Sequence, residues 1–280
     1  MLKGLTRAGL GAIGNDEQLI TMASLYGFQS VDIHPKGLIH LLGGSSQVNE
    51  LLSQKNILIG SMGLSVDWRS TEEKFRAGLV ELADEAAAAA VVGCTRCCTY
   101  ILPSVDEPSA HFMIVATRRM RVCAQILGAF GIRLGLEFVG PHHLRTRWAN
   151  PFIWTMEETL DWIETIHEPN VGLLLDAYHW YTNGLVLEDI ERLQANQIVH
   201  VHINDAPNVP VADVLDNGRL YPGEGVIDLT GFLRSLQKIG YQGPVAQEIL
   251  TQEPPTDSPE MLLARSRDCF TKVFNAAGIS

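Results

Sequence analysis

The stretch "VGLLLDAYHW", residues 171–180, has the pattern of a strand that is buried on both faces and ends in a carboxylate. Five apolar or glycine residues lead directly into Asp176, and His179 follows three residues later. Near-continuous apolar strands of this kind are typical of parallel sheets that helices cover on both faces. A carboxylate at the end of a dry strand costs free energy unless a positive charge meets it. We therefore expect a cation next to Asp176.

The same strand pattern recurs along the chain and alternates with segments that have helical patterns. The predicted strands are residues 5–11, 30–34, 57–64, 94–102, 133–140, 171–179, 198–205 and 244–250. The predicted helices are residues 15–27, 70–90, 156–166, 228–240 and 258–277. Eight strands with helical or irregular crossovers, and no linker or low-complexity break, predict a single domain over residues 1–280. A (β/α)8 TIM barrel, which typically takes ~250 residues, fits this chain.

A doubly wound open sheet is the alternative fold. Its first strand would need a phosphate-binding glycine turn, and "GLGAIG" at residues 9–14 matches the letters G-x-G-x-x-G. Asp32 lies near the position of a ribose-binding acid. The segment nevertheless lacks the pattern of a full nucleotide-binding half-domain, so the barrel remains the prediction.

Composition and charge narrow the class of partner. Of the 280 residues, 46% are hydrophobic and 19% charged, and the net charge of −11 would on average repel nucleic acid. No apolar run approaches the ~20 residues of a membrane helix, and the N-terminus lacks the pattern of a signal peptide. Five cysteines, an odd number without disulfide spacing, favour free buried thiols. We predict a cytoplasmic protein that binds neither nucleic acid nor membrane.

The last four predicted strands each carry a potential metal ligand close to the C-terminal end, where the chemistry of a (β/α)8 TIM barrel lies. These residues are Glu137, Asp176, His202 and Glu248. Taken singly, each has an ordinary alternative: a solvated glutamate, a helix cap or a core histidine. Three carboxylates and one imidazole from adjacent strands together favour a divalent ion such as Mn²⁺, Mg²⁺, Co²⁺ or Zn²⁺.

A second histidine, His200, lies two residues before His202 in the same predicted strand. We expect these two side chains to point to opposite faces, so that only one of them faces the barrel interior. We choose His202 because it is nearer to the C-terminal end of the strand.

Four segments carry a family resemblance: "LGLEFVG" (134–140), "NVGLLLDAYHWYTNG" (170–184), "VHINDAP" (201–207) and residues 219–249. They resemble the sugar isomerase/epimerase superfamily with a xylose isomerase-like barrel, and inosose isomerases in particular. The resemblance implies one divalent metal ion, with Mn²⁺ as the first choice, held by Glu137, Asp176, His202 and Glu248. It also implies that His179 contacts substrate oxygens or, in some members, a second metal. It implies further that Arg219 reaches a substrate hydroxyl, carbonyl or phosphate, with a surface arginine in a loop as the alternative.

The chain departs from the family's ketohexose 3-epimerases at one position. Those enzymes carry a substrate-binding glutamate six residues after the first metal glutamate, and His143 stands there in this chain. His143 is therefore a candidate for substrate binding, with an exposed loop residue as the alternative. From the first four strands we nominate His34. Trp68 and Trp154 are candidate apolar walls, with core or subunit-contact roles as the alternative.

The predicted chemistry is the movement of a carbonyl along a small sugar, keto-polyol or cyclitol, or inversion of the adjacent carbon. Both reactions remove a proton from carbon, and we assign that proton transfer to Glu137 and Glu248 around an enediolate. A dehydratase of a keto-polyol or of a dehydroshikimate-type substrate is the first alternative. An apurinic endonuclease or a non-catalytic sugar-binding relative fits less well, and assembly into a homo-oligomer is open.

Overall fold

The structure is a computed structural model and describes residues 1–279. Within these residues nine strands form one sheet, in the order β3-β2-β1-β11-β10-β9-β7-β5-β4, and all of its strand pairs are parallel. The strands are β1 (Leu2–Leu5), β2 (Ser30–Val31), β3 (Leu58–Ile59), β4 (Met62–Gly63), β5 (Arg96–Ile101), β7 (Arg133–Phe138), β9 (Val171–Asp176), β10 (Ile198–Ile203) and β11 (Pro244–Gln247).

The sheet closes on itself through β3 and β4. These two segments follow each other directly along the chain, yet β3 pairs with β2 while β4 pairs with β5. Backbone bonds continue on both sides of the interruption, from Gly60 N to Val31 O at 2.8 Å and from Leu64 N to Cys98 O at 2.9 Å. In the described chain, β3 and β4 thus act as one strand, which confirms the predicted eight-stranded barrel.

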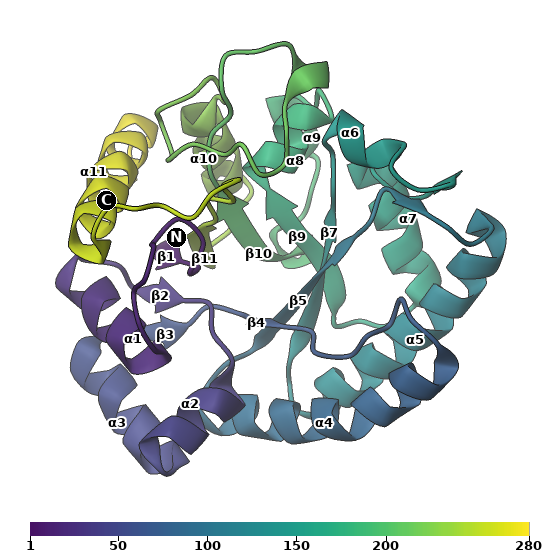
Figure 1. The fold of residues 1–280 in the computed structure, drawn as a ribbon, viewed down its shortest axis with the longest axis horizontal. Helices are drawn as coiled ribbons and strands as arrows, with labels where there is room; N and C mark the ends of the chain where they lie inside the picture. Colours follow the sequence, from purple (N-terminus) through teal and green to yellow (C-terminus); the bar gives the residue numbers. More distant parts are fainter. Residues whose placement is uncertain (280) are drawn as a thin grey trace.

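Helices surround this barrel on its outside (Figure 1). They are α1 (Asp16–Leu25), α2 (Pro35–Leu42), α3 (Ser45–Lys55), α4 (Glu72–Val91), α5 (Ser109–Ala129), α6 (His142–Arg145), α7 (Met156–Ile166), α8 (Ala177–Thr182), α9 (Leu187–Glu191), α10 (Leu229–Lys238) and α11 (Pro259–Ala277). Two 3-10 turns (Ala195–Gln197 and Val211–Asp213) and an antiparallel pair, β6 (Ser104–Val105) with β8 (Asn150–Pro151), lie in the connections.

The helix starts follow from local capping chemistry. Asn15 caps α1 in a capping box with Gln18, and Thr155 caps α7 in a second box with Glu158. Each box satisfies backbone N–H groups that the first turn of a helix leaves unpaired. At α4 the side chain of Thr71 is the cap, and it accepts the N–H of Lys74. These are the boundaries that the residue types predicted.

The first strand lies earlier than predicted. Its residues are Leu2–Leu5, and the segment predicted to be a strand, residues 5–11, is mostly loop. Gly9, Gly11 and Gly14 have φ angles of 82°, 60° and 86°, in the left-handed region that an extended strand does not use. The glycines therefore form a turn that leads from β1 to α1. Because the sheet is a barrel and not a doubly wound open sheet, the nucleotide-binding alternative is wrong.

The apolar strands are buried as their sequences predicted. Every residue of β9 and β10 is buried, because the barrel interior covers one face and the helices cover the other. Among residues 1–279, no helix is both long and apolar enough to cross a membrane. All five cysteines are free, and four of them are buried.

Candidate metal and substrate site

Four side chains of metal-binding type meet at the C-terminal ends of neighbouring strands. Glu137 lies in β7, Asp176 ends β9, His202 lies in β10, and Glu248 follows β11. One ligand atom from each residue lies within 4.8 Å of the others. The parallel register explains the meeting, because His202 pairs with Asp176 on one side and with the Ala246 position on the other. We name these four residues the ligand cluster.

His202 lies at the centre of the ligand cluster. Its Nδ1 atom is 3.5 Å from Glu248 Oε2, 3.7 Å from Glu137 Oε1 and 4.0 Å from Asp176 Oδ2. Among the described residues, neither His202 Nδ1 nor Glu137 Oε1 has a hydrogen-bond partner, although both atoms are buried. Unpaired buried polar atoms are costly. Oxygen and imidazole donors arranged in this way fit a divalent cation.

Burial and neighbouring charges shift the pKa values of the side chains in the ligand cluster. Burial raises the pKa of Glu137. Burial would also raise the pKa of Glu248, but the charges of His202 and Arg219 outweigh it and hold that pKa well below the usual range. Burial would lower the pKa of His202, yet Glu248 above all, together with Asp32 and Glu137, holds it well above its ordinary value. Without an ion, two cationic side chains therefore balance the carboxylates.

Arg219 is the second of these cations, and it is 4% exposed. Its Nη1 atom donates to Asp176 Oδ2 at 2.8 Å and to Glu248 Oε2 at 2.7 Å, while Nη2 donates to Asp216 Oδ1 at 2.8 Å. Burial would lower the pKa of Arg219, but the three carboxylates raise it well above the usual value. Arg219 thus fixes two members of the ligand cluster in place.

Asp176 has two roles in the local structure. Its Oδ1 accepts the backbone N–H of Tyr178 at 2.6 Å, so it caps α8, and Asn204 Nδ2 donates to both of its oxygens at 3.0 and 3.2 Å. The helix-cap alternative and membership of the ligand cluster are therefore compatible. These bonds orient a carboxylate that is fully buried.

His179 lies in α8, whereas the sequence placed it at the end of a strand. The cap at Asp176 starts the helix and turns the chain there. The Nδ1 atom of His179 accepts the N–H of Gly140 at 3.3 Å. Its Nε2 atom lies 3.9 Å from Glu137 Oε1 and 3.4 Å from Arg219 Nη2. His179 therefore lies directly against the ligand cluster.

A cavity of about 200 Å³ opens beside the cluster. Glu137, His202 and Glu248 line one side of it. The polar residues on the other sides come from the first four strands of the barrel and the segments after them: Thr6, Asp32, Ser61, Thr99 and Tyr100. The sequence did not single out these five residues as residues of this site, because isolated polar side chains in strands and loops have no pattern of their own.

The remaining nominated residues are not among those that line this cavity. His34 precedes α2 and is exposed, with its ring close to Gly63. His143 lies in α6 and lines a separate groove of about 460 Å³ that also includes Asp216. Trp68 is a core residue, 1% exposed, and its Nε1 donates to Thr99 Oγ1 at 3.1 Å. Trp154 packs under the guanidinium of Arg145 at 3.8 Å.

The prediction for His200 was wrong. Both His200 and His202 point into the barrel, where their Nε2 atoms lie 2.8 and 3.4 Å from Asp32 Oδ2. Residues two apart in a strand share a face, so the pair could not have pointed to opposite faces. His200 is buried below His202 and lies outside the ligand cluster.

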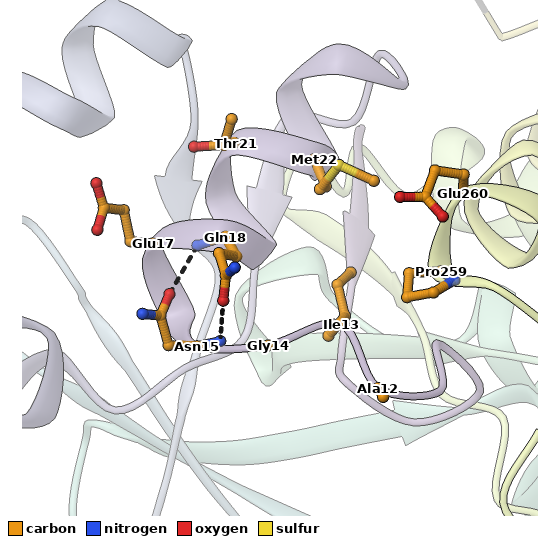
Figure 2. Close-up of a pocket in the computed structure, with 10 residues that line it drawn as sticks. All are labelled: Ala12, Ile13, Gly14, Asn15, Glu17, Gln18, Thr21, Met22, Pro259 and Glu260. Carbon is orange, nitrogen blue, oxygen red and sulfur yellow. Dashed lines mark hydrogen bonds between the residues drawn. The ribbon is translucent and has the colours of Figure 1, made fainter.

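A larger surface groove of about 520 Å³ lies away from this site, between the start of α1 and the start of α11 (Figure 2). Glu17 and Glu260 line it from the two helices. The polar groups of Asn15 and Gln18 beside it bond to each other in the capping box that starts α1. At α1, the polar groups along this groove are therefore those that cap the start of the helix.

The fold and the site together define a class. The sequence profile described as "Xylose isomerase-like TIM barrel" matches residues 20–272, and the chain belongs to that family. A xylose isomerase domain protein from Alicyclobacillus acidocaldarius has a similar solved structure, with a TM-score of 0.91 and 32% identity over 99% of both chains. A crystal structure of the IOLI protein with a bound zinc atom has a TM-score of 0.80, with 19% identity over 98% of both chains.

Among named relatives, an inosose isomerase from Bacillus subtilis is 30% identical over 130 residues. That match covers 46% of this chain and 44% of the relative. The chain thus matches about half of the length of the first curated relatives.

Proposed function

We propose that this protein is a divalent-metal-dependent isomerase or epimerase of a small sugar, keto-polyol or cyclitol. The observation that carries the proposal is the ligand cluster itself: three carboxylates and an imidazole within 4.8 Å, beside a polar cavity at the C-terminal ends of the strands. The inosose isomerase among the relatives supports the choice of a sugar or cyclitol substrate.

Glu137, Asp176, His202 and Glu248 would hold one divalent ion. The ion would supply Lewis-acid stabilisation of the negative charge that develops on the oxygens of an enolising sugar, which is worth several kcal/mol. Mn²⁺ is our first choice, and the donor set also suits Mg²⁺, Co²⁺ and Zn²⁺. The bound zinc atom of the related IOLI structure supports a divalent ion in this family.

Glu137 and Glu248 would remove and return the proton at carbon. They approach His202 Nδ1 from two sides, at 3.7 and 3.5 Å, so that a substrate next to the cluster meets a carboxylate on either side. Burial raises the pKa of Glu137, whereas the charges of His202 and Arg219 lower that of Glu248, so the two carboxylates differ in their affinity for a proton. Such a pair separates the acid and base roles.

His179 and Arg219 would act on the substrate oxygens. His179 Nε2 faces Glu137 and would donate there, because Nδ1 accepts the backbone N–H of Gly140 and leaves the hydrogen of the ring on Nε2. Arg219 would keep Glu248 ionised through the 2.7 Å bond while its charge reaches an adjacent hydroxyl or carbonyl oxygen. His34 and His143 would contact the part of the substrate that extends beyond the cavity.

The proposal extends to the location of the protein and to its partners. We propose that it works in the cytoplasm, in carbohydrate metabolism, with a small sugar or polyol as its partner and with neither nucleic acid nor membrane. Self-association into a homo-oligomer would bring a second copy to the loops at the cavity mouth.

The test begins with elemental analysis of the purified chain, followed by a panel of polyols, ketoses and inososes with the identified ion restored. We expect one divalent ion per chain and a product isomeric with the substrate. Glu137→Gln should abolish turnover, while Glu81→Gln on the surface of α4 should leave it unchanged. An enone absorbance would reveal the dehydratase instead, and turnover that survives Glu137→Gln would refute the assignment of the proton transfer.

A further inference from the structure

A second group of buried polar side chains lies under the ligand cluster, inside the barrel. Asp32, which follows β2, brings one carboxylate oxygen, Oδ2, to two histidines of β10. That oxygen lies 2.8 Å from His200 Nε2 and 3.4 Å from His202 Nε2. The His200 side chain is 0% exposed and that of Asp32 is 11% exposed. The function proposed above gives Asp32 and His200 no role.

The geometry of the His202 ring links this group to the cluster. Its Nε2 atom faces Asp32, while its Nδ1 atom faces Glu137 and Glu248. A ring nitrogen that donates to a carboxylate leaves the other nitrogen with the lone pair that a metal needs. Metal-binding histidines are commonly fixed in this way by a carboxylate behind them.

We propose that Asp32, supported by His200, is a positioning residue that holds the His202 ring with Nδ1 directed at the three carboxylates of the ligand cluster. This inference rests on the proposed function only in naming the metal ion as the group that Nδ1 meets. Asp32 lies outside the ligand cluster, and in this proposal it acts on the ion through His202.

The packing around Asp32 supports a fixed position. Gly60 lies against the carboxylate, because a Cβ atom built there would be 2.5 Å from Asp32 Oδ1. Gly60 has no positive φ angle, so closeness to Asp32 rather than backbone strain is what favours glycine. On the other side, His200 occupies Oδ2 with its own Nε2 donor, and its ring meets that of His202 edge to face at 5.1 Å. The carboxylate therefore has little freedom to turn away from His202.

A second metal ion is the competing explanation, since ligand atoms of Asp32, His200 and His202 also lie within 4.8 Å of one another. The 2.8 Å contact between Asp32 Oδ2 and His200 Nε2 is a normal hydrogen-bond distance, and the other oxygen of Asp32 faces Gly60. Hydrogen bonds thus account for Asp32 Oδ2 and the two Nε2 atoms without an ion, while Asp32 Oδ1 and His200 Nδ1 have no hydrogen-bond partner among the described residues. The stoichiometry of bound metal separates the two explanations.

The first experiment measures zinc affinity by competition with a chromophoric chelator. We expect Asp32→Ala to weaken binding about 10- to 100-fold, as the loss of a carboxylate behind a metal-binding histidine does elsewhere. Asp32→Asn should keep most of the affinity, because its carbonyl oxygen can accept from both histidines. Gly60→Ala keeps the charge but displaces the carboxylate, so it should weaken binding in the same direction. Asp84→Ala, an exposed carboxylate on α4, is the matched control and should change nothing.

The second experiment needs no metal: crystal structures of the metal-free wild type and of the Asp32 and Gly60 variants. In Asp32→Ala the His202 ring should turn or become disordered, and in Asp32→Asn it should keep its orientation. Unchanged zinc affinity together with an unchanged ring in Asp32→Ala would overturn the inference, as would two ions per wild-type chain. If the wild type binds no metal, the proposed function fails, and the ring orientation still decides the role of Asp32.

Discussion

The two sides of the barrel are built differently. The metal half, which we define as β7, β9, β10 and β11, has three strands of six residues that are buried almost throughout. The cavity half, β1 to β5, contains three strands of only two residues each. All four members of the ligand cluster come from the metal half, and the other polar residues of the cavity come from the cavity half.

This contrast between long and short strands indicates that the two halves of the barrel have different roles. A long buried strand in a parallel sheet has a fixed register, so its last side chain arrives at a defined point. A strand of two residues passes early into loop, and its polar side chains line a cavity whose shape the loops set. We infer that the metal half supplies the chemistry and that the cavity half selects the substrate.

The largest difference between the halves should appear in catalysis. Glu248→Gln removes a proton-transfer group, so turnover should fall about 10²- to 10⁴-fold. Tyr100→Phe, in the cavity half, removes one hydroxyl and should cost about tenfold or less, since a neutral hydrogen bond contributes ~0.5–1.5 kcal/mol. Steady-state kinetics on the identified substrate would measure both. Equal losses would remove the proposed division of work.

The loss of stability on mutation should also be larger in the metal half than in the cavity half. Arg219→Met leaves buried carboxylates without their cation, which should lower the free energy of unfolding by about 3–5 kcal/mol in the metal-free protein. Arg7→Met breaks an ion pair with Asp16 that is partly exposed, and it should cost about 1 kcal/mol or less. Urea unfolding measures both variants. A divalent ion should restore part of the loss in Arg219→Met, and a loss that no ion affects would count against the shared site.

The dependence of metal binding on pH should belong to the metal half alone. The pKa of His202 is held well above its ordinary value, chiefly by Glu248, so the metal-free protein keeps the second proton of this ring to a higher pH than a free imidazole would. A metal ion must displace that proton, and its affinity should therefore fall as the pH is lowered. Calorimetry in buffers of different ionisation enthalpy would count the released protons. Ser61→Ala, in the cavity half, should leave the count unchanged, and no proton release in the wild type would contradict the assignment.

The smallest expected effect is one that the two halves share. Thr71 caps α4 beside the cavity half, and Thr155 caps α7 beside the metal half. Replacing either by alanine should lower the free energy of unfolding by about 1 kcal/mol, because each hydroxyl accepts one backbone N–H of a first turn. Thermal unfolding of the two variants compares them directly. A much larger loss at one cap would show that helix ends, and not only the site, differ between the halves.

The metal half was predictable from sequence because its signals are local. A run such as "VGLLLD" combines an apolar strand with a terminal carboxylate, and equivalent strand ends must meet at one edge of a parallel barrel. The cavity half offered weaker signals. Gly9 and Gly11 were assigned to a strand of residues 5–11 although they form a turn, and strands of two residues are too short to show a period of two.

The pairing of Asp32 with His200 could not have been read from either segment. The two residues are 168 positions apart and come from non-adjacent strands that face each other across the barrel interior. The contacts of Arg219 are of the same kind, since its side chain meets Asp176 and Glu248 at the ends of two other strands, β9 and β11.

The amino-acid sequence by itself determined the alternation of strands and helices, the barrel, and the four residues that form the ligand cluster, because each depends on the periodicity of one segment and on the rules of parallel sheets. Only the tertiary structure decided which way each ring nitrogen points, which carboxylates Arg219 bridges and which residues of the cavity half line the site. Those features depend on closing the barrel, which brings side chains from distant parts of the chain within hydrogen-bond distance.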